Sequence, residues 1–171
     1  MSIDNWAEEK ESKINVAKQR LMIFLLGPGI PEVELTKRKH IANELRKKKY
    51  NVIVMEDERD WLEYGTIVDK FQDLLQKFDP QLIIALFTKN GSSLGVTFEI
   101  GYICGYYGRV ETAKRLRFLL EAKLDERKIL TSYIRKGLFT TICHSSYYND
   151  NEIIEFIDSF ARNRIIQLKW A

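Results

Sequence analysis

Five short apolar runs, separated by segments with helical spacing, limit what this chain can fold into. The runs are LMIFLL (21–26), NVIVM (51–55), QLIIALF (81–87), RLRFLLEA (115–122) and LFTTICHS (138–145). Continuous apolar runs of this length are typical of strands that are buried on both faces of a sheet. No hairpin turn separates them, and each connection is long enough for a helix, so the strands are expected to pair in parallel.

The connecting segments predict the helices of an α/β fold. Helical periodicity is clearest at 67–78, where apolar side chains form one stripe, and further helices are expected at 32–49, 94–107, 125–137 and 150–165. Because such crossovers are right-handed, the chain should form a three-layer, doubly wound, five-stranded parallel sheet. We expect the flavodoxin-like strand order 2-1-3-4-5, with a ligand crevice where strands 1 and 3 diverge.

Length and composition favour one domain. The chain has 171 residues, of which 45% are hydrophobic and 30% charged, an ordinary globular balance. We expect a single α/β domain over 21–171, preceded by a charged helix or arm over 1–20. The polar start, MSIDNWAEEKESK, is unlike a secretion signal, and no apolar run has membrane-spanning length. These features predict a cytoplasmic protein.

Charge and cysteine content argue against several other classes of protein. A net charge of +3 is too small to predict a nucleic-acid partner. Two cysteines, Cys104 and Cys143, make no disulfide framework. The pair Cys143-His144 lacks the further ligands that a zinc site needs, so no metal is expected.

Two loops are candidates for ligand binding at the crevice. Gly27, Pro28 and Gly29 follow the first strand, but position 32 is Glu, so the dinucleotide-binding pattern G-x-G-x-x-G is absent. This turn either lets a ligand approach the backbone or is only a tight turn. The loop after the third strand, NGSSLG, places Ser92, Ser93 and Gly95 at a helix start. Such a loop suits an anion or a sugar hydroxyl, or its serines only cap the helix.

Glu99 stands among apolar neighbours just beyond that second loop. At helical spacing it shares a stripe with Tyr102 and Tyr106, whereas a separate apolar stripe faces the sheet. A carboxylate beside aromatic rings at a crevice suits a nucleophile or general base with a ligand stacked nearby. The alternative is an ordinary acidic residue early in a helix, where it is favoured by about 0.3–1 kcal/mol.

The stretch SSLGVTFEIGYICG (92–105) resembles the signature of the nucleoside 2-deoxyribosyltransferase superfamily. Within it, the sequence is most similar to the 2'-deoxynucleoside 5'-phosphate N-hydrolase branch. The pair Asp73-Leu74 before the third strand and the segment LTSYIRKG (130–137) also match that branch. The resemblance extends over residues 21–160.

The resemblance implies an enzyme that cleaves or transfers an N-glycosidic bond without metal or organic cofactor. It makes Glu99 the nucleophile and Asp73 the second carboxylate, in the manner of a retaining glycosidase. It makes Ser93 a contact for a 5' hydroxyl or phosphate. Thr131, with Ser132 beside it, would reach the site of a neighbouring subunit, which implies a homodimer that binds a small nucleoside or nucleotide.

The sequence departs from that family at two places. The family's first-strand tyrosine is Phe24 here, with Tyr102 or Tyr64 as the candidates to replace it. The family's phosphate-binding turn after strand 1 is replaced by GPGIP (27–31). Two other functions stay open, and the departures support the second of them. One is a TIR-like NAD glycohydrolase, which cleavage of NAD but not of deoxynucleotides would favour. The other is a catalytically silent nucleotide-binding sensor.

Overall fold

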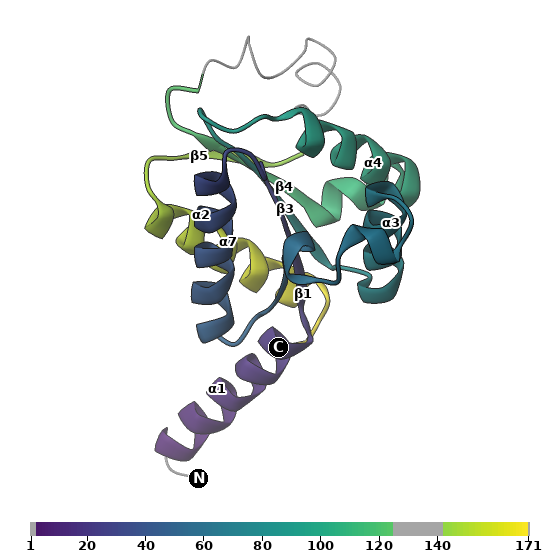
Figure 1. The fold of residues 1–171 in the computed structure, drawn as a ribbon. Coiled ribbons are helices and arrows are strands. Elements are labelled where there is room, and N and C mark those ends of the chain that lie inside the picture. Colours follow the sequence, from purple (N-terminus) through teal and green to yellow (C-terminus); the bar gives the residue numbers. More distant parts are fainter. Residues whose placement is uncertain (1–2, 125–141, 171) are drawn as a thin grey trace.

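The computed structural model describes residues 3–124 and 142–170, and it forms one five-stranded parallel sheet (Figure 1). The strand order is β2-β1-β3-β4-β5, and every neighbouring pair is parallel. The predicted topology is thus confirmed: the chain has a flavodoxin-like α/β fold. The strands are β1 (Met22–Leu26), β2 (Asn51–Ile53), β3 (Leu82–Phe87), β4 (Leu116–Glu121) and β5 (His144–Tyr147).

Helices cover both faces of the sheet. The helices of the described residues are α1 (Ile3–Arg20), α2 (Glu32–Lys47), α3 (Ile67–Phe78), α4 (Leu94–Arg115) and α7 (Asp150–Gln167), with short 3-10 helices η1 (Met55–Asp57) and η2 (Trp61–Glu63). Figure 1 shows α2 and α7 on one face, α3 and α4 on the other, and α1 extending away from the sheet. Within the segment where a helix or arm was expected, Ile3–Arg20 form a helix, and α3 has the bounds predicted for it.

Each face has its own hydrophobic core. On one side, Ile41 and Leu45 of α2 and Ile153 and Ile157 of α7 pack on the sheet. On the other, side chains of α3 and α4 such as Phe71, Leu74, Ile100 and Ile103 pack on it. Strand β3 lies between the two cores, and all six of its residues are buried, which explains its unbroken apolar sequence.

Two predicted strands have different bounds in the structure. β2 ends at Ile53, and the chain turns into η1 where strand was expected to continue to residue 55. β5 spans His144–Tyr147 rather than 138–145. The helix predicted at 125–137 and the first residues of the predicted fifth strand lie outside the described residues.

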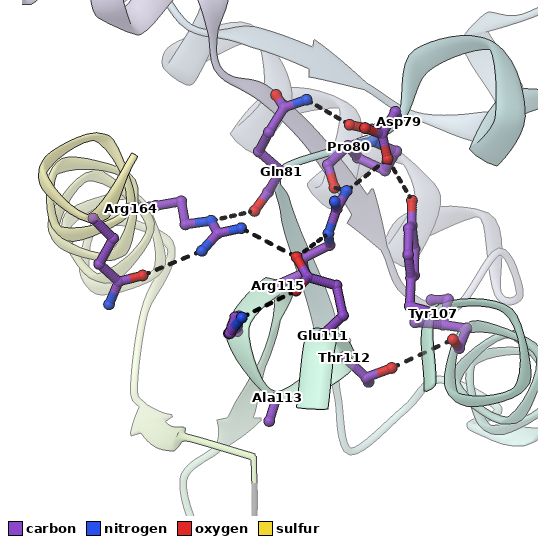
Figure 2. A network of polar contacts seen from close by, with 12 residues as sticks. Asp79, Pro80, Gln81, Tyr107, Glu111, Thr112, Ala113, Arg115 and Arg164 are labelled. Atoms are coloured by element: carbon purple, nitrogen blue, oxygen red, sulfur yellow. Dashed lines mark hydrogen bonds and ion pairs between the residues drawn. The ribbon is translucent and has the colours of Figure 1, made fainter. Parts of the chain in front are cut away.

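A polar network closes the sheet at the amino ends of β3 and β4 (Figure 2). Arg115 Nη1 donates to Asp79 Oδ1 at 2.6 Å and to the Pro80 carbonyl at 3.0 Å. Arg164 Nε, from α7, donates to the Gln81 carbonyl at 3.0 Å. These contacts tie α3, α4 and α7 together at this end. Ligands of such folds bind at the opposite, carboxyl end of the strands.

Within the part of the chain that the structure describes, no helix has both the length and the apolar character needed to span a membrane.

Candidate functional site

The loops after β1 and β3 meet at the carboxyl end of the sheet, as predicted. The Ser92 amide donates to the Ile30 carbonyl at 3.3 Å, and the Gly91 amide donates to the Thr88 hydroxyl at 3.1 Å. A Cβ atom at Gly91 would overlap the Pro28 ring and the Thr88 hydroxyl. The two loops are therefore in direct contact, and that contact depends on a residue without a side chain.

A cavity of about 380 Å³ opens beside these loops. Its wall is mostly apolar and comes from five places: the turn after β1, η1, the first turns of α3, the loop after β3, and the start of α4. The lining residues are Gly27, Pro28, Gly29, Ile30, Met55, Glu56, Ile67, Val68, Phe71, Ser92, Leu94, Gly95, Val96, Phe98 and Glu99. A concave apolar site with a few polar groups, at the switch point of an α/β sheet, is where such folds bind ligands.

Glu99 is one of the residues that line this cavity. Its Oε2 atom is buried and has no hydrogen-bond partner. Burial raises the pKa of Glu99 to about 8, although the nearby Arg38 guanidinium acts to lower this pKa, and Glu56 contributes to raising it. The carboxyl group is therefore largely protonated at neutral pH, and it changes charge close to the physiological range.

Arg38, from α2, contacts two of the residues that line the cavity. Its side chain is almost fully buried, and Nη1 donates to the Gly27 carbonyl at 2.7 Å. Nη2 donates to Glu56 Oε1 in a short ion pair. Arg38 thus joins the turn after β1 to η1, and it sets the charge near Glu99.

Glu56 is the second carboxylate of the cavity, and our reading of the sequence missed it. It lies in η1, directly after β2, and its Oε2 atom is buried without a partner. One signal was present: an acidic residue at the carboxyl end of the strand that neighbours β1.

The structure brings together most of the predicted site. Glu99 and the predicted binding residues Gly27, Pro28, Gly29, Ser92 and Gly95 line one cavity. Ser93 is the residue before α4 and makes no capping bond through its side chain, and it does not line the cavity.

The other four predicted site residues are Asp73, Tyr102, Thr131 and Ser132. Asp73 is exposed on α3 and does not line the cavity, whereas Glu56 does. Tyr102 packs edge-on against the Phe71 ring, with centroids 5.7 Å apart, and lies behind the cavity wall. Thr131 and Ser132 lie outside the described residues.

Phe24 is fully buried in β1, with its ring centroid 5.7 Å from that of Phe71. It is a core residue beneath the cavity and offers Glu99 no hydrogen bond. Among residues 3–124 and 142–170, no group of three or more His, Cys, Asp or Glu side chains is arranged to hold a metal ion.

Comparison with known proteins adds no family to this fold and site. No protein-family model matches the chain, and no curated protein matches it. What the chain does must therefore be argued from the cavity itself.

Proposed function

We propose that this protein cleaves or transfers the N-glycosidic bond of a nucleoside or nucleotide, with Glu99 as the nucleophile. The observation that carries the proposal is the unpartnered Glu99 carboxyl oxygen beside a ligand-sized cavity at the carboxyl end of the sheet. A buried carboxyl group without a partner is costly to keep, and such groups concentrate at sites of chemistry. The resemblance of residues 92–105 to nucleoside 2-deoxyribosyltransferases supports the same role.

The proposed reaction proceeds in two steps. An ionised Glu99 oxygen bonds to the anomeric carbon of the sugar while the bond to the base nitrogen breaks, and the electron pair leaves with the base. Water or a second base then attacks the same carbon and releases Glu99. Glu56 replaces Asp73 as the second carboxylate that stabilises positive charge on the sugar.

This chemistry requires the charged form of Glu99. With a pKa of about 8, about one molecule in ten carries it at pH 7. The rate at low substrate concentration should therefore rise with pH and level off above about pH 8, which is the titration of a group that acts as a base or nucleophile.

A catalytically silent sensor is the second candidate, and two observations favour it. Glu99 is mostly protonated at neutral pH, and Phe24 cannot orient it by a hydrogen bond. A sensor would bind a nucleotide in the same cavity and release no base.

We also propose that two copies pair through the outer face of α4. Leu94, Phe98, Gly101 and Gly105 share this face at helical spacing. Leu94 and Phe98 are 78% and 55% exposed, and both glycines face open space. Since Leu94 and Phe98 also line the cavity, a second copy docked here would stand beside the site.

The test is release of free base. The protein is incubated with nucleosides, nucleoside monophosphates and NAD, and the products are separated by chromatography. We expect base release from at least one substrate and a loss of at least about a thousandfold in Glu99→Gln. Glu155→Gln removes an exposed carboxylate on α7 and should keep the full rate. Tight binding without any release would favour the sensor.

A further inference from the structure

The ionisable side chains that line the cavity are all acidic. Among the described residues that line it, the ionisable side chains are Glu56 and Glu99, and no lysine, arginine or histidine is present. Arg38, the cation that acts on Glu99, does not line the cavity and donates hydrogen bonds to Gly27 and Glu56. When Glu99 is ionised, the set of Arg38, Glu56 and Glu99 therefore carries one net negative charge.

The two carboxylates have oxygens that nothing satisfies. Oε2 of Glu56 and Oε2 of Glu99 are both buried without a hydrogen-bond partner. Phe98, which is 55% exposed, supplies aromatic surface in the same wall, and the almost fully buried Phe71 lies in that wall as well. Carboxylates beside aromatic faces are the surroundings that attract a flat organic cation, through charge and through cation–π contact.

The leaving base gives an independent argument, which rests on the function proposed above. A neutral base must receive a proton as it departs, and a base with a fixed positive charge departs as a neutral molecule without one. Glu99 has no proton to donate when it attacks as a carboxylate. Glu56 is held in its ion pair with Arg38, so neither lining carboxyl group is placed to act as an acid.

We propose that the cavity binds nucleosides whose base carries a fixed positive charge, such as a quaternised pyridine. In the cleavage step the Glu99 oxygen bonds to the anomeric carbon, and the carbon–nitrogen bond breaks. Its electron pair passes to the ring nitrogen and cancels the positive charge of the base. The positive charge that develops on the sugar is met by the carboxylates.

Binding of such a cation is coupled to a proton. The groups that face Glu99 are Arg38 from α2 and Glu56 from η1, and the lining residues of α3 and of the loops after β1 and β3 are uncharged. A cation favours the ionised form of Glu99, so binding expels its proton. Affinity should rise about tenfold between about pH 7 and about pH 9.

The experiment compares two ligands of one shape. Nicotinamide riboside carries a permanent positive charge, and its reduced dihydro form is neutral. Both are titrated into the protein by calorimetry at about pH 7 and about pH 9, in buffers of different ionisation enthalpy. We expect the cation to bind at least about tenfold more tightly than the neutral form at the higher pH, with release of up to one proton at the lower pH.

Two variants test whether Glu99 causes the preference for the cation. Glu99→Gln should lose both the preference for the cation and the pH dependence, and Glu155→Gln should keep both. If Glu99→Gln does not fold, the comparison of the two ligands on the natural protein still shows whether the cavity prefers the cation. Equal affinity for the two forms, or affinity for the cation that does not change with pH, would overturn the inference.

The outcomes separate this inference from the proposed function. Tight, pH-dependent binding of the cation without release of nicotinamide would sustain the inference and remove the enzymatic proposal. Release of neutral bases, with no preference for the cation in binding, would support the enzymatic proposal and overturn the inference.

Discussion

The carboxyl group of Glu99 binds its proton more tightly in the folded protein than in the unfolded chain. Its pKa rises from 4.5 to about 8 on folding, chiefly because of burial. Between these two pH values the folded state holds a proton that the unfolded state has lost. The free energy of unfolding must therefore fall as the pH rises through this window, by at most about 1.4 kcal/mol per pH unit.

Replacing Glu99 by glutamine removes this titration. At about pH 8 we expect Glu99→Gln to be more stable than the natural protein by about 2–4 kcal/mol, and at about pH 4 the two should agree within about 1 kcal/mol. The difference in the free energy of unfolding is measured by urea denaturation, monitored by circular dichroism, at several pH values. A stability difference that is independent of pH would show that Glu99 does not titrate as described.

Arg38 acts on both stability and titration. Arg38→Met leaves Glu56 and the Gly27 carbonyl without their partner, and we expect it to cost about 3 kcal/mol. It also removes the charge that lowers the pKa of Glu99, so the pH at which base release reaches its plateau should move above 8.

Lys47→Met is the matched control for Arg38. Lys47 lies on the same helix in an exposed pair with Glu44, and its loss should cost less than about 1 kcal/mol. Equal effects of the two substitutions would contradict the buried role given to Arg38.

At the scale of elements, the site depends on two loops held in contact. Gly91→Ala would force the turn after β3 away from Pro28, at a cost of about 1–3 kcal/mol, and it should weaken ligand binding. Gly101→Ala adds the same methyl group where nothing lies within 4 Å and should be neutral or slightly stabilising, because alanine is a better helix former. Thermal unfolding of both variants tests this; a loss of stability in Gly101→Ala equal to that in Gly91→Ala would contradict it.

The elements that sequence predicted best are those whose pattern has one physical explanation. The 67–78 helix was predicted from a single apolar stripe. Strand β3 was predicted from a continuous apolar run, which is typical of a strand that is buried on both faces. The end of β2 was missed because the apolar residues Val54 and Met55 are buried after the strand has ended, so hydrophobicity alone does not mark the boundary.

The same reasoning explains which site residues were found. Topology placed the Gly27–Gly29 turn and Glu99 at one crevice. Glu56 is one of several acids in MEDERD (55–60), and Arg38 is one of several cations in TKRKH (36–40); composition cannot choose among them. Spacing does single out Arg38, which lies on the buried stripe of Glu34, Ile41 and Leu45.

At the scale of the whole molecule, the two ends of the sheet differ. One end is closed by the Arg115 network (Figure 2), and the other holds the cavity with the α4 face beside it. If α4 pairs two copies, Gly105→Arg should convert a dimer to a monomer, because it places a charged side chain in the proposed interface. The substitution should not disturb the single chain, since nothing lies within 4 Å of a Cβ atom at this position.

Sedimentation at micromolar concentration measures the oligomeric state of the natural protein and of each variant. Ser159→Arg adds the same charge at an exposed position on α7 and should leave the dimer intact. A natural protein that sediments only as a monomer would remove the dimer from the account.

The central claim is that the carboxylate at position 99 forms a bond to the sugar. A fluorinated nucleoside that slows the second step should leave its sugar on the protein, and peptide mass spectrometry locates it. We predict the added mass on the peptide that contains Glu99 and its absence in Glu99→Gln. A sugar attached to a different residue, or base release by Glu99→Gln at the natural rate, would contradict the account.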